Sequence, residues 1–492
     1  MSLLLPFGIL LLSSLICLLP RMDGRARRWV GLITSLATLF SLGWFFGPVL
    51  LGIAPGWGTS WWTVSRFSSL MGLLVAWLYA CAMVVSYYYL DVETRKGILS
   101  IRHVRLYMGS IPIFVLSMLV AIFANNAGLL WVALEMTTLS TTLLVSFYGK
   151  KSSMEAAWKY IVICSTGIAL GLFGILVMGY AGLNAGLQEA EAFRLNLLSE
   201  VAPLMDPGIV MWAFVFLFIG FGTKIGLVPM HTWLPDAHSK TPAPVSAMLS
   251  GILLNVAFFT LLRFKGVVDQ TLESNTWTNQ FFLIFGVFSI LLPAFILLIQ
   301  RNYKRMLAYH SVEHMGIMAF LIGLGPLGMI AFTVHMIGHA LAKSTLFFGA
   351  GELLQRFEST KFHLVHDVMK RAPRTGILFL FAALFLIAVP PSGLFLSEYV
   401  LVGEGMSVHP LLTGIALLGI TMAGLGLMRH LFELLFFPVT PEEKQDVPVE
   451  TWNLTHTVMS VQLVVGFVFG IWMLSGQGWP FLTQISATIL SL

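Results

Sequence analysis

Long apolar stretches recur along the whole chain and are separated by short polar connections. Each stretch is long enough to cross a hydrocarbon layer of ~30 Å as an α-helix, and none shows the two-residue alternation of a membrane β-barrel. We therefore expect an all-α polytopic membrane protein with about fourteen transmembrane helices. The expected helices span residues 2–20, 29–51, 68–91, 106–124, 127–148, 154–183, 208–228, 243–264, 279–299, 304–323, 326–350, 374–403, 409–437 and 455–476.

Two of the expected helices are interrupted by proline, which removes a backbone donor and breaks or kinks a helix. Helix 208–228 runs into Pro229, and helix 374–403 contains Pro390 and Pro391. The two lie five helices apart, so they would cross the membrane in opposite directions. Paired broken helices in inverted repeats are typical of transporters, and this pattern predicts two inverted five-helix repeats.

The repeats divide the expected membrane domain into four parts. Residues 1–105 form the three N-terminal helices, and residues 106–264 form the first repeat. The second repeat occupies residues 279–437, and residues 454–492 hold the C-terminal helix. The connections between helices are mostly short, so no separate catalytic domain is expected.

Lysine and arginine are distributed unevenly between the connections. Of the 28 basic residues, 21 lie in or beside odd-numbered connections and 4 in or beside even-numbered ones. Because basic connections stay on the cytoplasmic side, both termini are expected on the opposite face of the inner (plasma) membrane. The formal net charge of +5 resides largely in these membrane-flanking segments, so nucleic acid is not an expected partner.

Charge is scarce in this chain, with 10% charged and 57% hydrophobic residues, whereas a soluble domain has about 25% charged residues. An ionisable side chain at the bilayer centre costs about 2.5–3.5 kcal/mol on insertion scales, so each one is a functional candidate. Ionisable residues inside the expected helices include Glu135, Lys224, His310, Glu313, His314, His335, His339, Lys343, Glu398, Arg429, His430 and Glu433.

The spacing of these residues favours a relay. His335, His339 and Lys343 recur at every fourth position and share one helix face. His310 lies on the same face as Glu313, one helix earlier. Buried lysine, carboxylate and imidazole groups can exchange protons, so protons are the expected cargo. Each residue taken singly could equally form a hydrogen bond that only fixes helix packing.

No cofactor-binding pattern is found. Cys17, Cys81 and Cys164 lack the spacing of a metal or iron–sulfur site. The sequence GLGPLG at 323–328 matches a glycine-rich dinucleotide motif, but it joins two expected membrane helices without a preceding strand. No cofactor and no metal are expected in this chain.

Several segments carry a family resemblance. PMHTWLPDAHSKTPAPVSAMLSGILLN at 229–255 closely resembles the signature of the antiporter-like, proton-translocating subunits of respiratory complex I and its relatives. LEMTTLS at 134–140 resembles the same family. AYHSVEHMG at 308–316 and HALAKSTLFFGAGE at 339–352 look most like the F component of the formate-hydrogenlyase-type (hydrogenase 4) complexes.

This resemblance implies roles for individual residues. It implies that Glu135 and Lys224 form a pair in one half-channel, and that Glu398 is the terminal charge of the relay. Where the complex I relatives carry a lysine after GILL, this sequence has Asn255. We expect Lys343 to take over the linking role of that lysine, together with the histidines of its stripe.

Two histidines flank the turn within the signature segment. His231 and His238 are both expected at the cytoplasmic mouth of the proton path, where protons could enter. Histidine titrates near pH ~6.5, which suits a group that exchanges protons. Asp236 and Lys240 lie in the same segment and are expected to have a more structural role.

The expected function is that of a proton-translocating membrane subunit of a redox-driven complex, either a group 4 nickel–iron hydrogenase or an NADH:quinone oxidoreductase-like complex. The nickel–iron centre and the iron–sulfur clusters would lie in partner subunits. Expected partners are antiporter-like and quinone-site-like membrane subunits, peripheral redox subunits and lipid. Two alternatives stay open: a cation/proton antiporter subunit of the multisubunit sodium/proton type, and a non-pumping scaffold.

Overall fold

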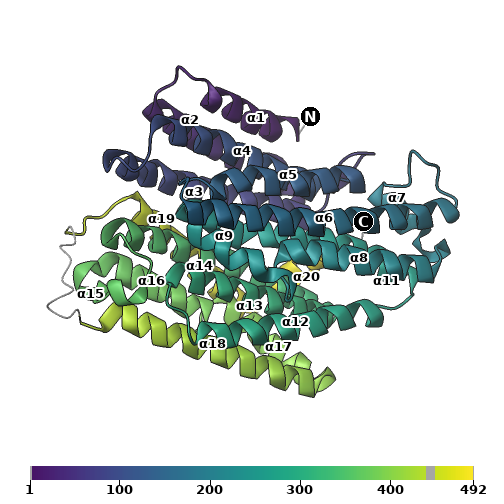
Figure 1. Cartoon of the computed structure of the whole chain (residues 1–492). Coiled ribbons are helices and arrows are strands. Elements are labelled where there is room, and N and C mark those ends of the chain that lie inside the picture. Colours follow the sequence, from purple (N-terminus) through teal and green to yellow (C-terminus); the bar gives the residue numbers. More distant parts are fainter. Residues whose placement is uncertain (1–2, 439–448, 491–492) are drawn as a thin grey trace.

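A computed structural model describes residues 3–438 and 449–490. Its long helices run roughly side by side, with the N-terminal helices along one edge and α17 and α18 along the opposite edge (Figure 1). The first part of the chain forms α1 (Leu4–Leu18), α2 (Gly24–Leu50), the hairpin strands β1 (Trp57–Gly58) and β2 (Thr63–Val64), α3 (Arg66–Arg95), α4 (Ile101–Phe123), α5 (Ala127–Val145) and α6 (Lys151–Asn184).

The remaining described elements follow in two groups. The middle of the chain forms α7 (Leu195–Val201), η1 (Ala202–Leu204), α8 (Pro207–Ile225), η2 (Met230–Thr232), α9 (Trp233–Lys240), α10 (Ala243–Met248), η3 (Leu249–Leu253), α11 (Leu254–Thr271), α12 (Thr276–Leu297) and α13 (Tyr303–Gly323). The last part forms α14 (Pro326–Phe357), η4 (Phe362–Leu364), α15 (Val368–Arg371), α16 (Pro373–Leu386), α17 (Gly393–Val408), α18 (Pro410–Phe436), α19 (Leu454–Leu474) and α20 (Gly478–Leu490).

Every expected helix range contains a helix, or a pair of helices on either side of a break. Within the described residues, ten helices are long and apolar enough to cross a membrane. The total of fourteen crossings, the inverted repeats and the four-part division stay predictions. Lys444, one of the basic residues counted for the orientation, lies outside the described residues.

Both proline breaks are present where the sequence predicts them. The first separates α8 from η2 and α9, and the second separates α16 from α17. After the second break, the Ser392 side chain accepts a hydrogen bond from the Phe395 amide and so caps the new helix. A cap of this kind satisfies backbone donors that would otherwise be unpaired inside the membrane.

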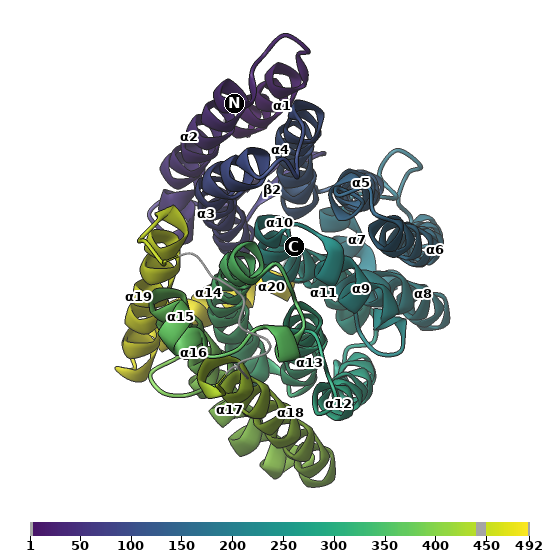
Figure 2. The same cartoon turned by 60° about the vertical axis from the view of Figure 1, so that its left-hand side comes forward.

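The centre of the bundle is the continuous rod formed by α10, η3 and α11, whose most apolar stretch is completely buried. It packs against α3, α8, α14 and α20, and Figure 2 shows these helices around it. The helices α13 and α14 are also almost entirely buried. Neither is among the ten apolar spans, because their histidines and charged residues lower the mean hydropathy. The polar residues are therefore concentrated in the protein interior, away from lipid.

The sequence did not predict α20, the short helix at the end of the chain. It has 13 residues, whereas a helix needs about 20 to cross a bilayer. Its apolar stretch was therefore too short to be predicted as a membrane helix. In the structure α20 packs against α3, α11 and α14 and closes one side of the central rod.

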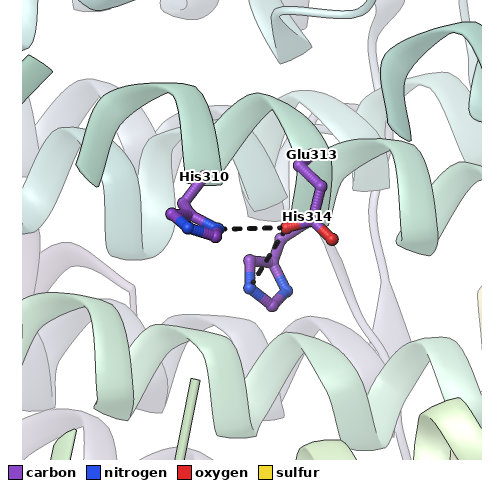
Figure 3. Close-up of side chains that lie close together, drawn as sticks. All are labelled: His310, Glu313 and His314. Carbon is purple, nitrogen blue, oxygen red and sulfur yellow. Dashed lines mark hydrogen bonds and ion pairs between the residues drawn. The ribbon is translucent and has the colours of Figure 1, made fainter. Parts of the chain in front are cut away.

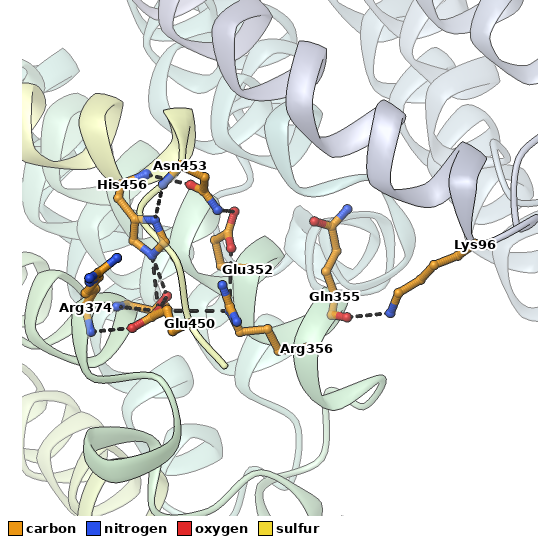
Figure 4. A network of polar contacts seen from close by, with 9 residues as sticks. Lys96, Glu352, Gln355, Arg356, Arg374, Glu450, Asn453 and His456 are labelled. Atoms are coloured by element: carbon orange, nitrogen blue, oxygen red, sulfur yellow. Dashed lines mark hydrogen bonds and ion pairs between the residues drawn. The ribbon is translucent and has the colours of Figure 1, made fainter. Parts of the chain in front are cut away.

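A buried carboxylate joins the segment before α19 to the start of α16 (Figure 4). Glu450 accepts hydrogen bonds from the backbone amides of Arg374 and Thr375 at 2.6 and 3.0 Å, and from the Thr375 hydroxyl at 2.6 Å. His456 Nδ1 accepts from the Asn453 amide, so its Nε2 donates toward Glu450 at 3.2 Å. Burial opposes ionisation of Glu450, but the donors from His456 and Thr375 outweigh it and lower the pKa from 4.5 to about 2.

This contact gives a prediction for stability. Glu450→Gln removes the charge from bonds that contribute about 1.5–3 kcal/mol each, so the variant should unfold at lower temperature than the wild type. Because the pKa of Glu450 is depressed in the folded state, its contribution is fully present above pH 4.5. It is lost as the pH falls toward 2. Thermal unfolding of the purified protein between pH 7 and pH 3 measures this difference.

The matched control is Glu189→Gln, which changes an exposed carboxylate. It should leave the unfolding temperature unchanged. Equal unfolding temperatures for wild type and Glu450→Gln at pH 7 would contradict the stabilising role of this carboxylate.

Candidate functional site

The first candidate site lies where α5, α6 and α8 meet. Lys224 on α8 is completely buried. Its Nζ donates hydrogen bonds to Thr138 Oγ1 at 2.8 Å and to the Tyr160 hydroxyl at 3.0 Å. Glu135 on α5 accepts a hydrogen bond from Ser165 at 2.6 Å. Carboxylate and ammonium are therefore both held by hydroxyl groups.

Glu135 and Lys224 were expected to pair, but within the described residues no ion pair joins them directly. Thr138 lies one helical turn after Glu135 on the same face of α5 and occupies the position next to the ammonium group. Glu135 Oε2 is buried without a hydrogen-bond partner in that part of the chain. The two groups are instead held separately, Glu135 by the Ser165 hydroxyl and Lys224 by the hydroxyls of Thr138 and Tyr160.

The break after α8 explains how the buried charge of Lys224 is tolerated. Lys224 lies in the last turn of α8, where the helix dipole favours a positive charge. Gly226 follows with a φ of +83°, a left-handed conformation that suits glycine and ends the helix. The carbonyl of Thr223 at this end accepts hydrogen bonds from the Gly226 amide at 3.2 Å and from Trp233 Nε1 at 2.8 Å.

The histidines after the break are buried. His231 on η2 is 7% exposed, and His238 on α9 is completely buried. The His238 ring stacks on Phe347 of α14 with centroids 5.4 Å apart. Neither ring nitrogen of His238 has a hydrogen-bond partner among the described residues. The expectation that His238 lies at the mouth is wrong, because α9 packs against α6 and α13 and turns this face inward.

Asn255 lies in the central rod, as the second residue of α11 after the π-helical segment η3. It is completely buried, and its Nδ2 donates to the Gly251 carbonyl at 2.9 Å. Its Oδ1 has no hydrogen-bond partner within the described residues. Single π-helical turns inside α-helices are frequent at functional sites, and this one places a polar side chain in the middle of the bundle.

The second candidate site is a buried histidine cluster between α13, α14 and α17. His310 and His314 flank Glu313, with ring nitrogens 3.4 and 3.6 Å from its Oε2 (Figure 3). His314 Nδ1 lies 2.9 Å from His335 Nε2. His335 Nδ1 in turn lies 2.8 Å from Ser397 Oγ. These contacts form an unbroken chain from α13 through α14 to α17.

The predicted stripe on α14 continues this cluster. His335, His339 and Lys343 are all completely buried. The ring centroid of His339 lies 5.1 Å from that of His314. Lys343 Nζ has no hydrogen-bond partner among the described residues, and its charge lies close enough to Glu313 for the two to interact electrostatically.

Glu398 completes the cluster from α17. One of its carboxylate oxygens lies within 4.8 Å of ring nitrogens of His314 and His335. It also lines a cavity of about 300 Å³ together with His310, Glu313 and His314. Apolar residues of α16 and α18 form the rest of the wall. The cluster therefore reaches a cavity between α13 and the helices α16, α17 and α18.

Two groups of side chains in this cluster have donors close enough to share a metal ion: His310, Glu313 and His314, and His314, His335 and Glu398. Imidazole and carboxylate are suitable zinc ligands. Within these groups His310 hydrogen-bonds Glu313 and His314 hydrogen-bonds His335, and that arrangement suits the sharing of protons.

The sequence did not identify the hydroxyl groups at either site. Thr138, Tyr160 and Ser165 hold the first pair, and Ser397 extends the histidine cluster. Serine and threonine are common in membrane helices, so their presence alone carries little information. Two of these hydroxyls could have been found from their positions beside the charged residues. Thr138 lies one turn after Glu135, and Ser397 directly precedes Glu398.

Comparisons with known proteins agree on one family. Residues 124–426 match the NADH:quinone oxidoreductase/Mrp antiporter transmembrane family. The hydrogenase-4 component F homolog of Methylacidiphilum infernorum (isolate V4) is 35% identical over 437 residues, which cover 88% of this chain and 89% of that protein.

Two solved structures have the same fold. A chain of the archaeal membrane-bound sulfane sulfur reductase superposes with a TM-score of 0.86 at 18% identity, covering 99% of this chain and 97% of that chain. A chain of respiratory complex I from Thermus thermophilus superposes with a TM-score of 0.82 at 17% identity, covering 100% of both chains.

Proposed function

Because the chain belongs to the NADH:quinone oxidoreductase/Mrp antiporter family, we propose that it is a proton-translocating, antiporter-like membrane subunit of a redox-driven complex. A complex of the hydrogenase-4 type is favoured, since the hydrogenase-4 relative matches along most of both chains. The nickel–iron centre and iron–sulfur clusters belong to partner subunits. The termini lie on the non-cytoplasmic side of the plasma membrane.

The observation that carries this proposal is the row of titratable groups across the bundle, in which Lys224 and Glu313 are buried and Glu135 and Glu398 are half-buried. Glu135 and Lys224 lie at one end, and the cluster around Glu313 and Glu398 lies at the other. Burying such groups in a membrane protein is costly, so a row of them supports a transport path more than independent packing roles.

The middle of the path is formed by groups with free hydrogen-bonding capacity. His238, Asn255 and Lys343 are completely buried, and each has polar atoms without a hydrogen-bond partner in the described part of the chain. Buried polar atoms in proteins are usually satisfied, often by ordered water. Water molecules at these groups would connect the hydroxyl-lined site of Lys224 to the histidine cluster.

In this proposal each group has a defined role. Glu135 and Lys224, each held by hydroxyl groups, load the proton. Lys343 exchanges it with the histidine cluster, where neutral imidazoles accept a proton on one nitrogen and release one from the other. Glu398 then passes the proton to the cavity between α13 and the helices α16, α17 and α18. His231 lies beside this path, near Tyr309.

Purification of the native complex through a tag on this chain tests the function. Redox subunits should co-purify, and the complex reconstituted in liposomes should move protons during turnover at the same rate with and without sodium. A complex that lacks redox subunits and transports protons only with sodium would overturn the proposal in favour of the multisubunit sodium/proton type. Redox turnover without proton movement would identify a scaffold.

A further inference from the structure

A polar cavity of about 740 Å³ lies at the ends of α3, α6, α13 and α14. It is on the side of the odd-numbered connections, which the distribution of basic residues assigns to the cytoplasm. None of the residues lining it belongs to the relay described above. At ~30 Å³ per molecule, the cavity has room for about twenty-five waters.

A buried carboxylate reaches this cavity from α3. Glu93 is 4% exposed. The Tyr148 hydroxyl donates to Glu93 Oε1 at 3.1 Å and lies 2.7 Å from the hydroxyl of Tyr89. Glu93 Oε2 is buried and has no hydrogen-bond partner among the described residues. An unpaired carboxylate oxygen at a polar cavity is a suitable acceptor for a proton.

The inner wall of the cavity leads to His238. Lys304 on α13 is 1% exposed, and its Nζ donates to the Thr241 carbonyl at 2.6 Å. His238 directly precedes Ser239, which lines the cavity. The charges of both Lys304 and Lys343 act on the His238 ring. His238 therefore lies between the cavity on one side and the stripe of α14 on the other.

We propose that this cavity is the inlet through which protons from the cytoplasmic face reach the relay, with Glu93 as the first acceptor and His238 as the link to Lys343. This inference rests on the proposed function. Glu93 takes a proton from cavity water and returns it to the next water. His238 accepts a proton on one ring nitrogen and releases one from the other, so each group returns to its starting charge after the transfer: Glu93 to a carboxylate and His238 to a neutral imidazole.

The test is Glu93→Gln in the full complex, reconstituted in liposomes. Proton pumping should fall by about tenfold or more, the order expected when a positioned proton-transfer group is removed. Glu358→Gln is the matched control. Glu358 lines the same cavity, but its side chain is 73% exposed and pairs with Lys96, so its replacement should leave pumping unchanged.

The outcomes separate the inlet from the function itself. If Glu93→Gln pumps like the wild type while Lys343→Ala does not, the inlet is wrong and the relay stands. If both variants pump like the wild type, the proposed relay also fails.

A second measurement applies even if Glu93→Gln does not assemble. Ser239→Cys places a thiol at the cavity, and a membrane-impermeant, negatively charged thiol reagent should modify it only from the cytoplasmic face and slow pumping. The wild-type chain, whose three cysteines are buried, measures the background modification by the reagent. Absence of modification, or modification without loss of pumping, would overturn the inlet.

Discussion

Replacement of Lys343 by alanine is expected to reduce proton pumping by about tenfold or more while the complex still assembles. Lys343 is completely buried and interacts electrostatically with Glu313. Its Nζ has no hydrogen-bond partner in the described part of the chain. A lysine that only fixed packing would be expected to bond a neighbouring group, as Lys304 bonds a carbonyl. Pumping during redox turnover, measured by an internal pH dye in liposomes, tests the expectation.

The control for this experiment is Lys370→Ala. The Lys370 side chain is 78% exposed, outside the long helices, and pairs only with Asp367 among the described residues. Its removal should affect neither pumping nor yield. If Lys343→Ala lowers the yield of the complex but leaves pumping per complex intact, Lys343 has a packing role and the linking role is excluded.

Replacement of Lys224 by methionine is expected to have an effect of similar size, about tenfold or more on pumping. Methionine keeps most of the apolar stem and removes the ammonium group. The hydroxyls of Thr138 and Tyr160 then lose their charged partner, and no ammonium group is left at this site to exchange a proton. Pumping is measured as for Lys343, with the amount of assembled complex determined by native gel.

Tyr160→Phe gives a graded comparison at the same site. It removes one hydrogen bond to Lys224 but keeps the ammonium group and its bond to Thr138. It should slow pumping less than Lys224→Met does. If the Lys224→Met variant pumps protons at the wild-type rate, the proton path bypasses α8.

Much of the fold could be predicted because its signals are local. Hydrophobic length locates the helices, and prolines at 229, 390 and 391 locate the breaks. The four-residue spacing of His335, His339 and Lys343 correctly placed three buried polar groups on one helix. Such signals depend only on residues a few positions apart.

The contacts between helices could not be predicted in the same way. The hydroxyl partners of Glu135 and Lys224 depend on how α5, α6 and α8 pack together. Glu93 and Lys304 are near helix ends, where charged residues ordinarily face water, yet packing buries both. His238 was expected at the cytoplasmic mouth of the proton path because it too lies near a helix end, yet it is completely buried. Burial of a polar residue near a helix end is decided by its neighbours in space.

The π-helical turn η3 sets which faces the two halves of the central rod present to their neighbours. Five residues, Leu249–Leu253, form this π-helical segment, which ends two positions before Asn255. Each residue of an α-helix advances the rotation by about 100°. The π-helical turn, with its i→i+5 bonds, holds about one residue more than an α-helical turn, so it absorbs that rotation and the two halves of the rod keep their faces. Deleting one residue of α11 would instead rotate the part of the rod after it by about that angle, although the turn itself would still be present.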